Sequence, residues 1–320
     1  MKKKVAGKLK TVRKRFRKDD LELMIISSPT VLWFLAFSYV PLFGIIFAFK
    51  NYRLTPGKGF IYSLFVSSKW VGLKNFEFLF RTPDLGNILR NTLLYNVAFI
   101  IIGVSLPVVL AVLIHEMFSK KLAKACQTAM FLPHFLSWVV VSYFAFAFLS
   151  SDKGLLNYMR NLFGQADIMW YQSPQYWPFI LIFINTWKTI GYSMVIYMAS
   201  ITSIDTTMYE SAVIDGASKW QQIKGITLPM LRPVISIMLI LNLGHIFSTD
   251  FGLFYIVTRD SGSILSVTQT LDVYVYKALM QQNNYNYSAA VSLFQSVLGC
   301  ILILISNKVV KRIDPESGLF

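Results

Sequence analysis

Residues 93–114 read LLYNVAFIIIGVSLPVVLAVLI, 22 residues without a charged side chain. A helix rises about 1.5 Å per residue, so this stretch is long enough to cross the ~30 Å hydrocarbon core of a bilayer. Five further stretches of similar length and character occur, and together the predicted spans are 24–49, 93–114, 128–149, 177–203, 233–258 and 285–307. The sequence therefore predicts an all-α fold, an integral membrane helical bundle with six transmembrane helices.

Composition supports a membrane protein. Of 320 residues 55% are hydrophobic and only 15% are charged, and the mean hydropathy is +0.52. A soluble domain of this length does not need so many apolar residues. The net charge is +15, which in a membrane protein indicates topology and contact with anionic lipid rather than nucleic acid. Cys126 and Cys300 are far apart in sequence and are expected to be core residues without a disulfide.

The basic residues predict the orientation. Residues 1–23 begin with ten Lys or Arg in the first eighteen positions and form a basic arm, either lying on anionic lipid or simply solvated. The arm, the loop 120–124 and the tail 308–312 fall on one side of six spans, which the positive-inside rule places in the cytoplasm together with both termini. The loop 52–90 is also basic, but long loops weigh less in that rule. The 26 uncharged residues 24–49 exceed a signal-peptide core, so this helix is expected to be retained.

The segment 204–232 is the most informative polar stretch. It reads IDTTMYESAVIDGASKWQQIKGITLPMLR, which predicts two short helices with a turn at Gly216, where glycine permits a backbone costly for other residues. Either Asp205 or Thr206 is expected to cap the first helix, and Ser218 the second. A compact two-helix unit of this kind suits docking to a partner protein. After it, Pro229 and Pro233 are expected to break the helix before the next span.

One pattern in this segment resembles a known motif. Glu210-Ser211-Ala212-x3-Gly216-x9-Ile226-x-Leu228-Pro229 is similar to the EAA motif of binding-protein-dependent ABC importer permeases, with Ser211 in place of the usual alanine as the one departure. The resemblance implies a coupling helix that seats in a groove of a cytoplasmic ATPase, where Glu210 bonds a basic group. The implied ATPase-coupling residues are Glu210, Ser211, Ala212, Asp215, Gly216, Leu228 and Pro229.

Further segments resemble the carbohydrate-uptake permeases, and in particular the branch for polysaccharides and complex oligosaccharides. These segments are 70–76 (WVGLKNF), 91–93 (NTL), 131–138 (FLPHFLSW), 272–276 (DVYVY), 288–296 (SAAVSLFQS) and 317–320 (SGLF). The resemblance implies a type I ABC importer permease fold over residues 24–320, in a bacterial plasma membrane. It also implies a second homologous permease subunit in a heterodimer, a cytoplasmic ATPase dimer, an extracellular substrate-binding lipoprotein and alternating access for an oligosaccharide.

Catalytic signatures are missing from the sequence. There is no G-x-x-x-x-G-K-[ST], and Gly57-Lys58-Gly59 is only a loop. The three histidines, at positions 115, 134 and 245, have no metal-ligand spacing, and no nucleophile–base set occurs. We therefore expect no catalysis, metal or cofactor in this chain, with ATP and Mg²⁺ bound by the partner ATPase.

Two ionisable residues interrupt the predicted spans. Lys188 and Asp250 each lie about 12–15 Å inside the outer end of a span, counted at ~1.5 Å per residue. An isolated charge at that depth is unfavourable, so such groups face a cavity or each other. One interpretation is a shared substrate site, and the other is a structural Lys–Asp pair. An unpaired Lys188 would favour an acidic sugar.

Sugar recognition needs aromatic platforms and hydrogen-bonding groups. Residues 242, 245 and 249 have the i, i+3, i+7 spacing of one helical face, and the resemblance to maltose-type permeases implies that Trp187 stacks on the sugar and Tyr192 contacts it. His245 stands where those relatives carry phenylalanine. The predicted substrate-binding residues are Asn185, Trp187, Lys188, Tyr192, Asn242, His245, Thr249 and Asp250. The loops 52–90 and 259–284 are expected to touch the binding protein.

Three alternatives remain at this point. The first is an importer of the same architecture that carries another solute, such as glycerol phosphate or an osmolyte. A secondary transporter would have inverted repeats and an intramembrane carboxylate relay, whereas no repeat is visible and Asp250 is the lone carboxylate well inside a predicted span. A non-transporting membrane scaffold would leave Lys188 and Asp250 unexplained.

Overall fold

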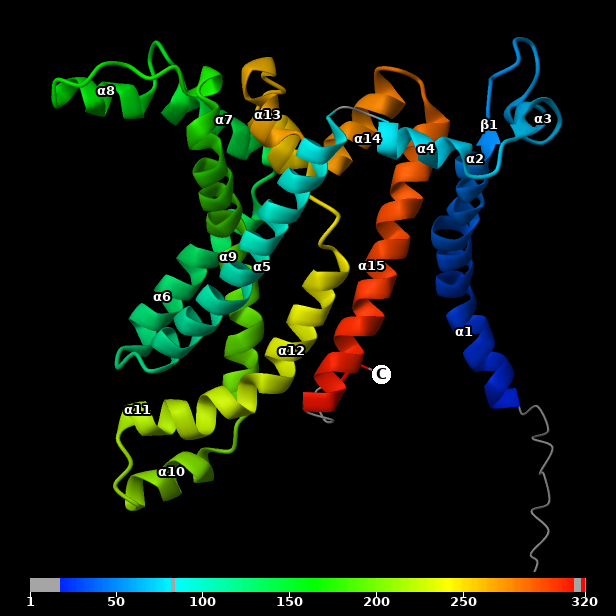
Figure 1. The fold of residues 1–320 in the computed structure, drawn as a ribbon. Coiled ribbons are helices and arrows are strands. Elements are labelled where there is room, and N and C mark those ends of the chain that lie inside the picture. Colours follow the sequence, from blue (N-terminus) through cyan, green and yellow to red (C-terminus); the bar gives the residue numbers. More distant parts are fainter. Residues whose placement is uncertain (1–17, 82–83, 314–317, 320) are drawn as a thin grey trace, which may run out of the picture. The chain divides into compact units, whose positions relative to one another are not determined.

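The computed structural model describes residues 18–81, 84–313 and 318–319, and Figure 1 shows that helices dominate it. The predicted basic arm lies largely outside these residues. Contacts divide the chain into two units, Met1–Ile46 and Phe47–Phe320. Within the described residues, five helices are long and apolar enough to cross a membrane, or six if one bent helix pair counts as a span. The all-α, membrane-spanning fold is thus confirmed.

The first unit is a continuous helical run. Helix α1 (Lys18–Phe34) passes into a π-helical stretch, Leu35–Tyr39, and a 3-10 stretch, Val40–Ile45. With α2 (Ile46–Phe49) these form the apolar segment Leu21–Phe49, which contains the predicted span 24–49. Most of its large apolar side chains are exposed, as expected for a helix whose surroundings are lipid.

Three long helices of the second unit agree with predicted spans. They are α5 (Leu85–His115), α9 (Trp177–Thr202) and α15 (Tyr285–Ile313). Helix α5 packs along α9 and takes part in all three buried apolar clusters. Each cluster contains one of three fully buried residues: Trp177 is in the first, Tyr197 in the second and Leu271 in the third. Helix α5 therefore forms the centre of the unit.

The predicted span 128–149 is not one continuous helix but part of a bent helix pair. Helix α6 (Lys120–Phe131) is followed by a 3-10 turn, Leu132–Phe135, and by α7 (Trp138–Leu149), and the two helical parts are bent by 102°. Pro133 cannot donate a backbone hydrogen bond, and the Ser137 hydroxyl caps the new helix by accepting from Val140 N at 3.3 Å. The chain turns at the proline and restarts at the serine.

The predicted span 233–258 is also not one straight helix. Helix α11 (Lys219–Gln222), a π-helical turn Ile223–Thr227 and α12 (Leu228–Gly244) form one apolar segment, Lys219–Gly244. Residues 245–250 are not helical, and a π-helical turn follows at Gly252–Val257. The predicted proline break is therefore misplaced. Pro229 lies in the first turn of α12, where its missing N–H is tolerated, and the helix continues through Pro233.

The break after α12 is possible because side chains satisfy the freed backbone. The Asn96 amide donates to the Ile246 carbonyl at 3.0 Å, and the Gln295 amide donates to the Phe247 carbonyl at 2.6 Å. The Thr249 N–H donates to the Asp272 carboxylate at 2.5 Å. Non-helical backbone at membrane depth is stable only when protein groups replace the missing bonds, and here α5, α14 and α15 supply them.

Shorter elements lie at the two ends of the second unit (Figure 1). One end carries the two-residue antiparallel strands β1 (Lys50–Asn51) and β2 (Lys69–Trp70), in which Lys50 pairs with Trp70. The same end carries α3 (Phe60–Tyr62), α4 (Lys74–Arg81), α8 (Leu155–Leu162), α13 (Leu265–Thr268) and α14 (Leu271–Met280). The opposite end carries α10 (Thr206–Ile214) and α11.

Candidate functional site

Residues 204–232 form the predicted two-helix unit, α10 and α11, joined at Gly216. Asp205, not Thr206, caps α10, because its Oδ1 accepts from Thr207 N at 2.9 Å. Ser218 caps α11 in a reciprocal capping box with Gln221. Gly216 has a φ of +78°, a left-handed conformation that disfavours residues with a side chain. The bond from Thr207 also holds the pKa of the Asp205 carboxyl below its ordinary value, because it stabilises the charged form.

One surface of this unit is apolar and open. Val213, Ile214 and Trp220 are 59%, 85% and 68% exposed. Glu210, which is near them in sequence, is also exposed. Asp215 and Gly216 are exposed as well. Exposed apolar residues gathered on a polar segment mark a contact surface for another molecule.

The two-helix unit is tied to the spans next to it. The Tyr209 and Thr227 hydroxyls are 2.9 Å apart, which links α10 to the π-helical turn before α12. The Gln222 amide donates to the Ala217 carbonyl at 3.0 Å. The Lys219 ammonium lies 3.1 Å from the carboxylate of Glu116, the residue that ends α5. Side-chain contacts therefore connect the unit to α5 and to the π-helical turn before α12.

The other predicted coupling residues have mainly structural surroundings. The Ser211 hydroxyl donates to the Thr207 carbonyl at 2.8 Å within α10, so the small-for-small departure from the motif fits the helix. Ala212 is half-buried, and its carbonyl accepts from Ala217 N at 2.8 Å across the turn. Leu228 and Pro229, also half-buried, begin α12.

Lys188 is bonded to the backbone of the bent span. Its ammonium donates to the His134 carbonyl at 2.9 Å and to the Leu136 carbonyl at 2.7 Å, and the residue is 8% exposed. These are carbonyls of the turn that separates α6 from α7. Lys188 thus stabilises the turn, and its ammonium group is already hydrogen-bonded to main-chain carbonyls.

Asp250 meets Lys188 through a tryptophan. The Trp138 indole N–H donates to Asp250 Oδ2 at 2.8 Å, and Asp250 Oδ1 accepts from Gly252 N at 2.8 Å. The predicted proximity of the two charges is present, but the ion pairs among the described residues do not include this pair. Asp250 caps the π-helical turn after the break in the chain.

The aromatic candidates on α9 face different neighbours. Tyr192 is exposed and stacks on the His134 ring, with centroids 4.7 Å apart. Trp187 lines a small, largely apolar cavity with residues of α6, including Cys126 and Met130. Asn185 is half-buried, one helical turn before Lys188. Trp187 and Tyr192 therefore contact different neighbours in the part of the chain that the structure describes.

The expected common face of residues 242, 245 and 249 is wrong, because the helix ends between them at Gly244. Asn242 remains on α12, and its amide donates to the Met238 carbonyl at 2.7 Å. His245 is exposed at the start of the non-helical segment. Thr249 lies beyond it, with its hydroxyl 3.0 Å from Asp272 Oδ2 and 2.8 Å from the Thr270 hydroxyl.

Asp272 and Gln295 are site residues that the sequence reasoning did not single out. Asp272 accepts from the Thr249 N–H and hydroxyl, and the Gln295 amide lies 3.4 Å from its other oxygen. Both occur in segments noted only for their resemblance to the polysaccharide branch, 272–276 and 288–296. A carboxylate and a glutamine in otherwise apolar or aromatic helices were the available signal.

A cavity of about 520 Å³ opens beside this network. It lies between the end of α12, the start of α14 and the middle of α15, and its polar lining includes His245, Ser248, Asp272, Ser292 and Gln295. Its volume is in the ~300–1,000 Å³ range of small-molecule sites. Hydroxyl, imidazole, amide and carboxylate groups in one cavity are suited to a ligand rich in hydroxyl groups.

Known proteins resemble the chain along nearly its full length. It is 34% identical over 304 residues to the polygalacturonan/rhamnogalacturonan transport system permease protein YteP of Bacillus subtilis (strain 168), an alignment that covers 95% of this chain and 91% of the relative. The crystal structure of a bacterial ABC transporter involved in the import of the acidic polysaccharide alginate has a chain that is 32% identical, with a TM-score of 0.83 and coverage of 93% of this chain and 97% of that one.

A second solved structure adds a complex. It is the bacterial alginate ABC transporter with an alginate pentasaccharide-bound periplasmic protein, and the matching chain has a TM-score of 0.81 and 31% identity over 92% of this chain and 96% of that one. Residues 103–315 match the family model described as binding-protein-dependent transport system inner membrane component. The chain belongs to this family of multi-pass membrane permeases.

Proposed function

We propose that this chain is the permease subunit of an ATP-driven importer that carries an oligosaccharide across a bacterial plasma membrane. The observation that carries the proposal is the exposed apolar surface of α10 and α11, which is tied to α5 and α12 by the Tyr209–Thr227 and Lys219–Glu116 contacts. Movement of these two helices would need an ATP-hydrolysing subunit, and the sequence has no ATP-binding loop of its own.

The ATP-hydrolysing component would be a separate cytoplasmic ATPase dimer that binds ATP and Mg²⁺. Val213, Ile214 and Trp220 would fill an apolar groove on it, and the Glu210 carboxylate would meet a basic group there. Closure of the ATPase would push α10 and α11, and the push would reach the broken span through α12. In this orientation both termini are cytoplasmic, as the distribution of Lys and Arg favours.

The substrate would pass beside the break after α12. The cavity lined by His245, Ser248 and Asp272 offers donors and acceptors for sugar hydroxyls, and the non-helical backbone gives the segment room to change conformation. The relatives named for polygalacturonan, rhamnogalacturonan and alginate favour an acidic oligosaccharide. Lys188 would not supply the specificity, because main-chain carbonyls already engage its charge.

Two further partners complete the proposal. A second homologous permease subunit would form the other half of the passage as a heterodimer, placing its own groups opposite Trp187, Tyr192 and Asn242. An extracellular binding lipoprotein would deliver the glycan to the loops 52–90 and 259–284. The alginate transporter complex with its periplasmic protein is the precedent for this arrangement.

The test is reconstitution of this chain with its copurified subunits in proteoliposomes. We expect ATP-dependent accumulation of a labelled oligogalacturonate when the binding protein is present, and an ATPase among the copurified chains identified by mass spectrometry. Uptake driven by an ion gradient without ATP would establish a secondary transporter instead. ATP-driven uptake of glycerol phosphate or an osmolyte, with no saccharide uptake, would assign another cargo.

A further inference from the structure

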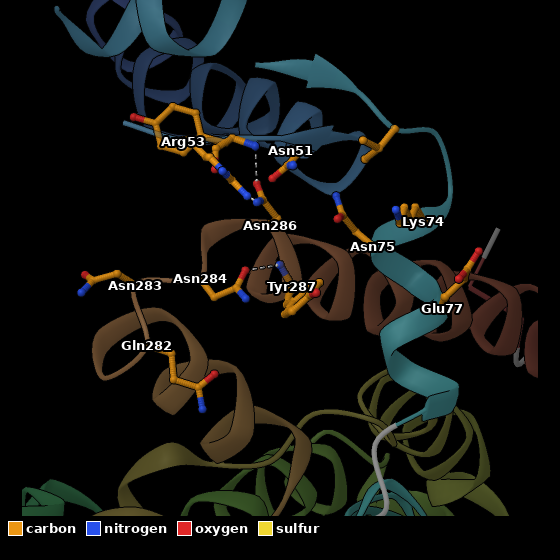
Figure 2. A pocket seen from close by; sticks show the side chains of 12 residues that line it. Asn51, Arg53, Lys74, Asn75, Glu77, Gln282, Asn283, Asn284, Asn286 and Tyr287 are labelled. Carbon is orange, nitrogen blue, oxygen red and sulfur yellow. Dashed lines mark hydrogen bonds between the residues drawn. The ribbon is translucent and has the colours of Figure 1, made fainter. Parts of the chain in front are cut away.

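A second cavity lies at the end of the second unit opposite α10 and α11, mostly within the loops that the proposed function assigns to the binding protein. Its volume is about 560 Å³, and it is enclosed by residues next to β1, the start of α4 and the turn between α14 and α15. Figure 2 shows the side chains from these three segments that line it. Segments more than 200 residues apart in sequence therefore form one site.

Specific hydrogen bonds build the walls of this cavity. The Tyr52 N–H donates to Asn286 Oδ1 at 2.9 Å, and the Asn286 amide donates back to the Tyr52 carbonyl at 3.3 Å. Asn75, which is buried, donates to the Ala48 and Lys50 carbonyls at 2.9 Å each. These bonds hold the main chain of both walls in place, so the cavity is a defined feature of the fold.

The lining of the cavity is electropositive. Arg53 and Lys74 both contribute cations to it. Glu77 contributes one carboxylate to the lining, so the two cations leave it with a net positive charge. Helix α15 also starts here at Tyr285, with the Asn284 side chain accepting from Tyr287 N at 3.2 Å. The positive end of a 29-residue helix dipole adds to the two cations.

Neutral hydrogen-bonding groups surround the charges. The side chains of Asn51, Gln282 and Asn283 line the same cavity, and Figure 2 shows them at its rim. Asn283 has a φ of +51° in the tight turn between α14 and α15. Amides both donate and accept, which suits vicinal hydroxyl groups, whereas an arginine fork suits a carboxylate.

We propose that this cavity binds a uronate unit of an acidic oligosaccharide at the outer mouth of the permease. The carboxylate would pair with Arg53 and Lys74, and the ring hydroxyls would bond to the surrounding amides. The volume is within the ~300–1,000 Å³ range of small-molecule sites. The inference rests on the proposed function and names a second saccharide site, with lining residues other than those of the cavity beside His245, that would bind the acid group of the substrate.

Direct binding to the assembled transporter tests the site. The complex is purified in detergent without the binding protein and titrated with trigalacturonate and with its methyl ester, which lacks the negative charges. We expect the double variant Arg53→Gln/Lys74→Gln to bind trigalacturonate at least ~10-fold more weakly, because charge-assisted bonds are lost. The affinity for the ester should be the same in the variant and the wild type.

The control is Lys153→Gln, which removes one exposed cation from the loop before α8 and should leave trigalacturonate affinity unchanged. Arg53→Lys/Lys74→Arg keeps the charge and should retain most of the affinity if the double glutamine variant fails to fold. Equal trigalacturonate affinity in wild type and the glutamine variant would overturn the proposal. So would a variant that loses the binding protein while keeping trigalacturonate affinity, because a protein would then be the occupant.

Failure of the proposed function would be seen in a different measurement. It would appear as absence of ATP-driven saccharide uptake by wild-type proteoliposomes, whereas the site is assayed by equilibrium binding without ATP. The two results are therefore independent.

Discussion

The Lys188 ammonium lies over the Trp138 indole, 5.1 Å from the ring centroid, and the same indole donates to Asp250 at 2.8 Å. This stack joins the continuous helix α9 to the first residue of α7 and to the cap of the π-helical turn at Gly252. A cation over an indole is stabilised by the ring quadrupole, and more so when water is excluded. Both breaks in the membrane-spanning part are thus fixed to one helix at one place.

Replacement of Lys188 by methionine tests this structural role. The substitution keeps an unbranched side chain, one atom shorter, and leaves the His134 and Leu136 carbonyls without their donor. Since hydrogen bonds to charged groups contribute about 1.5–3 kcal/mol each and two are lost, we expect a loss of roughly 3–6 kcal/mol and a lower melting temperature in detergent. Uptake of trigalacturonate and of its neutral ester should fall equally. A loss confined to the acidic sugar would contradict the structural assignment.

Gly216 is the residue of the two-helix unit, α10 and α11, at which we expect substitutions to be tolerated least. Its φ of +78° is disfavoured for a β-branched residue by about 1–2 kcal/mol, so we expect Gly216→Val to distort the turn between α10 and α11. The complex should still insert and assemble, but ATP-dependent transport should be lost. Gly225→Ala is the matched control, because a Cβ there meets open space. Unchanged transport by Gly216→Val would refute the coupling role of the turn.

The sequence predicts the spans well where hydropathy alone decides them. Helices α5, α9 and α15 contain the predicted spans 93–114, 177–203 and 285–307 almost entirely. Helices α10 and α11 follow from Asp205, Gly216 and Ser218, because capping and turn formation are local. It fails at Pro133 and Gly244. The two breaks depend on Lys188, Asn96, Gln295 and Asp272, which come from distant parts of the chain to satisfy the freed backbone.

The candidate site is less predictable for the same reason. Asn75 and Asn91 occur in segments noted for family resemblance. Asn75 donates to the Ala48 and Lys50 carbonyls, and Asn91 donates to the Ser266 and Gln269 carbonyls. These partners can be identified only from the tertiary fold. Lys188 was correctly singled out as an unusual intramembrane charge. Its partners were not predictable, because main-chain acceptors exposed by a helix break leave no trace in composition.

The contact between α9 and α6 depends on Gly191. A Cβ at this position would overlap the Met130 carbonyl oxygen, so Gly191→Ala should force the helices apart. Overpacking of this kind lowers the free energy of unfolding by typically ~1–3 kcal/mol, and we expect a lower melting temperature of the purified complex. Gly103→Ala on α5 is the control, since its Cβ has no neighbour within 4 Å. Equal melting temperatures for the two variants would contradict the close helix contact.

Asp205 makes the coupling unit sensitive to acid. In the folded chain its pKa lies below the ordinary value of 3.8, because the Thr207 N–H bonds the carboxylate. The cap therefore stabilises α10 fully well above pH 3.8, and this stabilisation is lost as the pH falls through the lowered pKa. Hydrogen exchange of the Thr207 amide, expressed as a protection factor, should be level above about pH 5 and decline as the pH falls below 3.8. Asp205→Asn caps the helix without titrating, so its protection should stay level over that range. The same decline in Asp205→Asn would show that the carboxyl is not the source of the pH dependence, and Asp205→Ala should lack the protection at every pH.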